Sequence, residues 1–133
     1  MTELEDQIVL VTGANRGMGR EYITQLLERG VAKVYATARN PERINGTDSR
    51  VTALRLDVTD PDSVAAAADA APDVSVLINN AGIVRGSSVL AADTAGLREE
   101  LETNLFGPLA MASGVTLPKV SVMLGNTKAS ADA

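Results

Sequence analysis

Short apolar runs alternate with longer amphipathic stretches along most of the chain. The runs 34–36 and 74–78 are mostly apolar on both faces, which is typical of buried parallel strands. The pattern predicts strands at about 7–12, 33–38, 51–57 and 74–79. It also predicts helices at about 17–29, 61–70 and 94–113, with at most a short helix at 41–44.

Start and stop signals support these helices. Gly30 stands where a helix C-terminal glycine belongs, and Asp60-Pro61 supplies an N-cap followed by proline at the first helical position. The alternating order implies right-handed crossovers between parallel strands. We therefore predict an α/β fold, a Rossmann-type parallel sheet with flanking helices.

Three glycines follow the first apolar run. Gly13, Gly17 and Gly19 lie between the predicted strand and the predicted helix, the context in which a glycine cluster binds a dinucleotide. The first allows a sharp turn, the second lets the backbone approach a pyrophosphate, and the third lets helix and strand pack closely. The helix start then offers N–H groups to the phosphates. The alternative is a glycine-rich turn without a ligand.

The glycine spacing, Gly-x3-Gly-x-Gly, together with Asn79-Asn80-Ala81-Gly82, resembles the short-chain dehydrogenase/reductase family over about residues 5–118. The resemblance implies a nicotinamide dinucleotide cofactor and hydride transfer between the nicotinamide and a carbonyl or alcohol carbon. It implies that Asn80, Ala81 and Gly82 line the adenosine ribose and also steady the sheet. The first motif contributes the predicted cofactor-binding residues Gly13, Asn15, Arg16, Gly17, Met18 and Gly19.

Two arginines favour NADP(H) over NAD(H). Arg39 lies just beyond the second predicted strand, where an acidic residue would bind the ribose 2′-hydroxyl of NAD and an arginine favours a 2′-phosphate. No Asp or Glu occurs at 34–41. Arg16 is a second cation near the same phosphate in the NADP-preferring members that the chain resembles. The alternative is that both arginines are solvated surface charges.

Asp57 ends the third predicted strand. The resemblance implies that its side chain holds the adenine amino group and that the backbone of Val58 lies near the adenine. A strand-end aspartate can instead simply cap a turn.

The catalytic residues implied by the resemblance are an Asn, a Ser and a Tyr-x-x-x-Lys pair, in which the tyrosine is the general acid/base. Asn104 matches the asparagine. Neither Tyr22 nor Tyr35 is followed by lysine four residues later, and Leu124 stands four residues before Lys128. We therefore expect a partial catalytic set and no turnover by this chain alone.

The end of the chain resembles the family poorly, so we divide it into a binding half-domain at 1–118 and an atypical tail at 119–133. The tail could supply a substitute fifth strand at 120–124 or be a foreign sequence, and 129–133 should be disordered. The fold is then incomplete in its C-terminal half. Unless the tail or another chain covers them, the fourth strand and the long helix would expose apolar surface and favour self-association.

Composition removes several function classes. The net charge of −5 and only three aromatic residues argue against nucleic-acid or anionic-membrane partners. No apolar run could span a membrane. The chain has no cysteine and no histidine, which excludes thiol catalysis and a Ser-His-Asp triad; no metal site is predicted. The acidic start is unlike a signal peptide, and we expect a cytoplasmic protein.

Three functions remain open. The first is an NADP(H)-dependent oxidoreductase. The second is a non-catalytic nucleotide-binding module whose partner contacts matter more than turnover. The third is an inactive truncated product in which the motifs record ancestry only.

Overall fold

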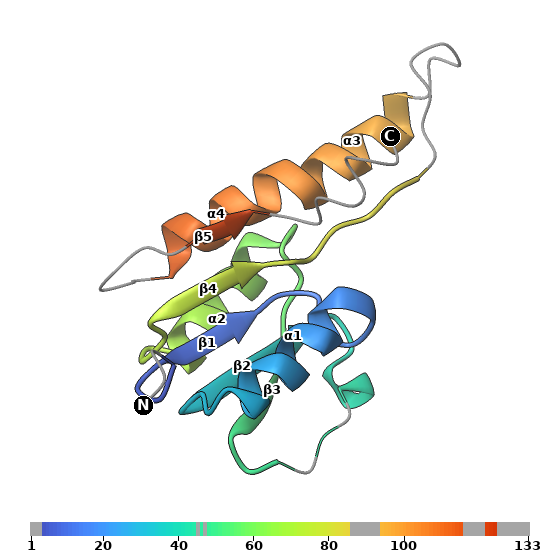
Figure 1. Ribbon diagram of the computed structural model, residues 1–133. Coiled ribbons are helices and arrows are strands. Elements are labelled where there is room, and N and C mark those ends of the chain that lie inside the picture. The colour runs from blue at the N-terminus through green and yellow to red at the C-terminus, as the bar shows by residue number, and fades with distance from the viewer. Residues whose placement is uncertain (1–3, 45, 47, 86–93, 116–121, 125–133) are drawn as a thin grey trace.

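The computed structural model describes residues 4–44, 46, 48–85, 94–115 and 122–124. Five parallel strands form one sheet in the order β3-β2-β1-β4-β5 (Figure 1). The strands are β1 (Ile8–Val11), β2 (Lys33–Ala38), β3 (Val51–Arg55), β4 (Val76–Asn79) and β5 (Val122–Leu124). The predicted boundary at 118 and the predicted disorder at 129–133 lie outside the described residues.

Helices cover both faces of the sheet. Helix α1 packs on one face and helices α2 and α4 on the other (Figure 1). The helical elements are α1 (Gly17–Glu28), the 3₁₀ turn η1 (Pro41–Arg43), α2 (Pro61–Ala70), α3 (Thr94–Leu101), the π-helical η2 (Glu102–Phe106) and α4 (Gly107–Gly114). The predicted Rossmann-type parallel sheet with flanking helices is thus confirmed.

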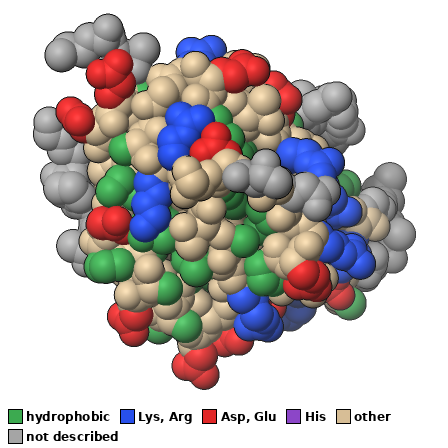
Figure 2. All heavy atoms as spheres, turned by 90° about the horizontal axis from the view of Figure 1, so that it is seen from below, with side chains coloured by type: hydrophobic (Ala, Val, Ile, Leu, Met, Phe, Trp, Pro, Cys, Tyr) green, Lys and Arg blue, Asp and Glu red, His purple; other side chains and the backbone are tan. Residues whose placement is uncertain are grey.

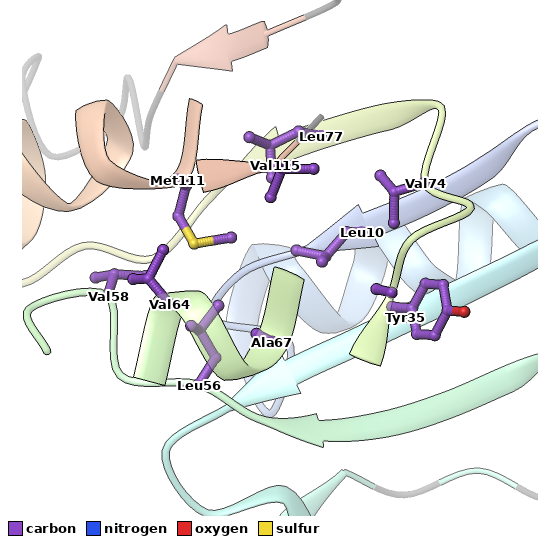
Figure 3. Packing of buried hydrophobic residues seen from close by; sticks show 11 residues of the cluster. Leu10, Tyr35, Leu56, Val58, Val64, Ala67, Val74, Leu77, Met111 and Val115 are labelled. Carbon is purple, nitrogen blue, oxygen red and sulfur yellow. The ribbon is translucent and has the colours of Figure 1, made fainter. Parts of the chain in front are cut away.

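The core has two parts because successive strand residues point to opposite faces. Val9 and Val11 pack toward α1, whereas Leu10, between them, packs toward α2 and α4. Figure 3 shows the second cluster, in which Met111 of α4 meets Val64 of α2. All of these side chains are buried. Because both faces of the strands are covered, their sequences are continuous apolar runs.

Helix ends follow the sequence signals. Gly30 adopts a φ of +79°, and its N–H donates to the Leu27 carbonyl while the Val31 N–H donates to that of Leu26, both at 3.1 Å. This is a Schellman motif. The Asp60 side chain accepts from the Asp62 N–H at 3.0 Å, so it caps α2 as predicted.

The fourth strand begins two residues later than predicted. The Ile8 N–H donates to the Ser75 hydroxyl at 2.9 Å, where a backbone carbonyl would continue the ladder. A side chain thereby replaces the backbone partner, and regular pairing starts at Val76.

The predicted long helix at 94–113 is found at 94–114, but it is not uniform. Its middle turn, η2, is π-helical, which the apolar pattern did not indicate. Gly107 follows η2 and lies against Val58. A Cβ at Gly107 would come within 2.7 Å of the Val58 Cγ2, so a larger residue would force a shift. The opposite side of the helix carries four apolar side chains with exposed fractions of 48–55%: Leu101, Leu105, Phe106 and Leu109.

The fourth strand is not exposed, because the substitute fifth strand predicted at 120–124 is found as β5 at Val122–Leu124. β4 lies between β1 and β5, and β5 pairs with it in parallel from Leu77↔Val122 to Asn79↔Leu124. The apolar exposure also expected on the long helix is found there.

Candidate functional site

A groove of about 830 Å³ runs along the carboxyl ends of the strands. Parallel α/β sheets bind ligands at this edge. Eleven of the twelve predicted cofactor-binding residues line it: Gly13, Asn15, Arg16, Gly17, Met18, Arg39, Asp57, Val58, Asn80, Ala81 and Gly82. The twelfth, Gly19, is buried and packs against Gly13 and Asn80.

The glycine turn leaves no room for side chains at two positions. A Cβ on Gly13 would lie 2.9 Å from the Cα of Ala81, and the φ of Gly13 is +64°. A Cβ on Gly19 would overlap the carbonyl oxygen of Gly13. Gly17 differs, since a Cβ there would meet nothing within 4 Å, and only its φ of +56° favours glycine.

Thr12 and Asn80 tie the glycine turn to the end of β4. The Thr12 hydroxyl accepts from the N–H groups of Asn80 at 3.0 Å and Ala81 at 2.9 Å. In return, the Asn80 amide donates to the carbonyls of Thr12 and Gly13, each at 3.2 Å. The sequence analysis assigned Thr12 no role. A polar residue that ends an apolar strand directly before the first glycine of the turn is the signal that could have identified it.

The start of α1 is open to an anion. Its N-cap residue, Arg16, makes no side-chain capping hydrogen bond. The first N–H groups of a helix have no partner within the helix, and the helix dipole places partial positive charge there. Since Gly17 and Met18 of this turn line the groove, a phosphate can approach it directly.

Three arginines line the part of the groove that lies over β1, β2 and β3: Arg16, Arg39 and Arg43. None of them has a carboxylate oxygen within 4.0 Å among the residues that the structure describes. Figure 2, seen from below, shows Lys and Arg side chains gathered on its right-hand side, the side to which the strands point in Figure 1. The sequence analysis predicted at most a short helix at 41–44 and assigned Arg43 no role.

Asp57 uses one carboxylate oxygen to fix the turn that follows β3. Its Oδ1 accepts from the Thr59 N–H at 3.0 Å and from the Thr59 hydroxyl at 2.6 Å. The Thr59 hydroxyl is the main cause that lowers the pKa of Asp57, and the charges of Arg39 and Arg55 lower it further. Asp57 thus caps this turn through Oδ1, and its Oδ2 has no hydrogen-bond partner in the described part of the chain.

Ile83 and Arg85, which line the groove in the segment after β4, are hydrogen-bonded to the long helix. Asn104, in η2, accepts from the Ile83 N–H at 2.8 Å and donates to the Ile83 carbonyl at 2.7 Å. Two residues after Ile83, the Arg85 side chain pairs with Glu99 at 2.7 Å, and the Arg85 backbone N–H donates to the Glu100 carboxylate at 2.6 Å. Glu102 and Thr103 of η2 line the groove themselves, and π-helical turns often occur at functional sites.

The catalytic set is not brought together in the described residues. Asn104 spends both ends of its amide on Ile83, so it positions the groove wall. The hydroxyl of Tyr35 bonds Asp73 on the loop before β4, at the amino-terminal edge of the sheet. Tyr22 packs on α1 against the other core cluster. Lys128 lies outside the described residues.

A family model described as short chain dehydrogenase matches residues 7–126. The chain therefore belongs to the short-chain dehydrogenase/reductase family. It is 33% identical over 125 residues to the short-chain dehydrogenase anuI of Penicillium roqueforti, covering 85% of this chain and 50% of that protein. It is 34% identical over 119 residues to the 3-oxoacyl-[acyl-carrier-protein] reductase FabG of Escherichia coli, covering 84% and 48%.

Solved structures agree with this assignment. A short-chain dehydrogenase from Burkholderia cenocepacia in complex with NADP matches with a TM-score of 0.80 and 42% identity, covering 86% of this chain and 48% of that one. The NADPH-bound carbonyl reductase from chicken fatty liver matches with a TM-score of 0.77 and 32% identity, covering 86% and 48%. The chain spans about half the length of the relatives it matches.

Among the described helices, none is both long enough and apolar enough to cross a bilayer.

Proposed function

We propose that this chain binds NADP(H) in preference to NAD(H), as the cofactor half of an oxidoreductase that transfers hydride between the nicotinamide and a carbonyl or alcohol carbon. The observation that carries the proposal is the pair Arg16 and Arg39, cations that form no ion pair with any described residue and that line a groove whose glycine turn leaves space for a pyrophosphate. NADP in the Burkholderia relative and NADPH in the chicken reductase support the same choice.

The groove residues fit this cofactor part by part. The pyrophosphate would lie at the start of α1, where Gly13 leaves the space that a side chain would fill. Arg39 and Arg16 would bind the 2′-phosphate. The free Oδ2 of Asp57 would accept the adenine amino group beside the backbone of Val58, and Asn80, Ala81 and Gly82 would line the adenosine ribose.

The bound cofactor would supply the hydride chemistry, but this chain offers little to direct it. Asn104 is the one member of the family's catalytic set that the sequence matches, and its amide is engaged with Ile83. Neither tyrosine begins a Tyr-x-x-x-Lys motif. We therefore propose that the chain alone binds the cofactor without turnover, and the second candidate function is a non-catalytic nucleotide-binding module.

A fluorescence titration of NADPH with the purified chain, with NADH in parallel, tests the binding proposal. We expect saturable binding that is tighter for NADPH and is weakened by Arg39→Asp. Arg20→Asp is the matched control, because Arg20 is exposed on α1 outside the groove. Equal affinity for the two cofactors would contradict the preference, and steady NADPH oxidation with a carbonyl substrate would contradict the absence of turnover.

We also propose self-association through the long helix, and a cytoplasmic location consistent with a cysteine-free chain. The support for association is the exposed apolar face formed by Leu101, Leu105, Phe106 and Leu109. Sedimentation velocity should show a dimer or larger species that Leu105→Lys/Leu109→Lys converts to monomer. A compact monomer of the unchanged chain would contradict this proposal.

A further inference from the structure

The 3₁₀ turn η1 brings a third arginine to the groove. Arg43 is the last residue of this turn, and it lines the groove together with Arg39 and Asn40. The acidic residue beside it, Glu42, is exposed and does not line the groove. The turn thus presents its cation to the groove and leaves its carboxylate outside.

The backbone of η1 is well anchored. Pro41 opens the turn, where its ring restricts φ, and the Arg43 N–H donates to the Asn40 carbonyl at 3.1 Å. The Ile44 N–H donates to the Pro41 carbonyl at 2.9 Å, and the Ile44 side chain packs against the core cluster beneath α1. Arg43 is therefore carried on a fixed turn next to the end of β2.

The charges in this part of the groove are unbalanced. Arg16, Arg39 and Arg43 are cations without an ion-pair partner in the part of the chain described, and the nearby carboxylate, Asp57, is held by Thr59. Like charges gathered in one groove repel each other, and a dianion would relieve that repulsion. Guanidinium groups also suit phosphate, because their planar donors form paired hydrogen bonds with its oxygens.

We propose that Arg43 is a third phosphate-binding residue, which contacts the 2′-phosphate of the cofactor together with Arg16 and Arg39. This inference rests on the proposed binding of NADP(H) and adds a residue that determines specificity. Discrimination between the phosphorylated and the unphosphorylated cofactor then depends on η1 as well as on the residue that follows β2.

Two small probes isolate the 2′-phosphate. Adenosine 2′,5′-bisphosphate and 5′-AMP differ only by that group, and calorimetry measures their affinities without a protein chromophore. We expect Arg43→Gln to weaken bisphosphate binding about tenfold or more, since hydrogen bonds to charged groups are among the stronger ones, and to leave 5′-AMP binding unchanged. Arg43→Lys should recover part of the loss, and the salt dependence of bisphosphate binding should become shallower in Arg43→Gln.

Arg98→Gln is the matched control, because Arg98 lines the same groove from α3 and the variant loses the same charge. The decisive quantity is the ratio of bisphosphate affinity to 5′-AMP affinity. If Arg39→Gln lowers this ratio but Arg43→Gln has the same ratio as Arg98→Gln, the inference is overturned and the proposed function stands. A wild-type chain that binds the bisphosphate no more tightly than 5′-AMP would overturn both. Because Arg43 is exposed, circular dichroism should show each variant folded as the wild type.

Discussion

Charged side chains at the amino-terminal edge of the sheet are paired with one another, whereas three arginines at the carboxyl edge have no ion-pair partner among the described residues. At the amino-terminal edge, Lys33 donates to the Tyr35 hydroxyl at 2.6 Å, and that hydroxyl donates to Asp73 at 2.6 Å. The Lys33 ammonium also lies 3.6 Å from Asp73 and 4.2 Å from the centre of the Tyr35 ring. At the carboxyl edge, Arg16, Arg39 and Arg43 have no such partner within the described residues.

This difference separates charges that hold the fold from charges that are free for a ligand. Figure 3 shows the Tyr35 hydroxyl pointing away from the apolar cluster that buries its ring, so one side chain joins the core to the ion pair. Arg16, Arg39 and Arg43 form no ion pair within 4.0 Å among the residues that the structure describes. We therefore expect the amino-terminal edge to contribute to stability and the arginines of the carboxyl edge to serve the proposed cofactor binding.

The largest effect is expected from Gly19→Ala, which places a methyl group against the Gly13 carbonyl. The clash would displace Gly13, which lines the groove. The change should therefore cost about 3 kcal/mol of unfolding free energy and abolish NADPH binding. Gly46→Ala is the control, because a Cβ at Gly46 meets nothing within 4 Å. Denaturant unfolding and NADPH titration give the two readouts, and a Gly19→Ala chain that binds normally would contradict the close packing of this turn.

Thr12→Val should cost about 2 kcal/mol of unfolding free energy. The hydroxyl accepts from two N–H groups, and Thr12 is 1% exposed, so valine leaves those donors without a partner. Cofactor binding should weaken as well, because this hydroxyl ties the glycine turn to β4. Thr12→Ser keeps the hydroxyl and serves as the control; equal stability of the Ser and Val variants would show that the two hydrogen bonds contribute nothing.

Tyr35→Phe tests the other edge and should cost about 1 kcal/mol, because it removes the hydroxyl shared by Lys33 and Asp73. The ring still fills the core, and NADPH affinity should stay unchanged. Chemical denaturation and the same titration measure both quantities. A change in affinity would mean that the two edges are coupled.

The smallest effect is a pH dependence. The Tyr35 hydroxyl is the main cause that lowers the pKa of Asp73, and Lys33 lowers it further. A carboxyl whose pKa is lower in the folded than in the unfolded chain contributes stability above its unfolded pKa, and this is lost as pH falls through its folded pKa. Melting temperatures of wild type and Asp73→Asn should therefore differ at neutral pH and approach each other as pH falls from about 4, the unfolded pKa of an aspartate, through the lower folded pKa. A constant difference down to pH 2 would exclude this linkage.

Much of the fold could be predicted because each element carries a local signal. Apolar runs marked the buried strands, Gly30 and Asp60 marked helix ends, and the glycine turn placed the groove. The misses depend on contacts between distant residues. The hydroxyl of Ser75 delays β4, and the π-helical turn brings Asn104 to Ile83 across 21 positions. No local pattern encodes such pairings.

The candidate site shows the same division. Residues within the two motifs were found because their spacing is fixed, whereas Thr12 and Arg43 were missed. Their roles depend on what the fold places opposite them, the N–H groups after β4 for Thr12 and the shared groove for Arg43.

The most direct test of the central claim is to measure stability and affinity together on Arg39→Gln, with Tyr35→Phe as its counterpart. We predict that Arg39→Gln keeps the unfolding free energy of the wild type within about 0.5 kcal/mol, since surface changes usually do, while the preference for NADPH over NADH falls about tenfold or more. Tyr35→Phe should show the reverse. Loss of stability in Arg39→Gln with an unchanged preference for NADPH would contradict the claim that the groove arginines are kept free for a phosphate.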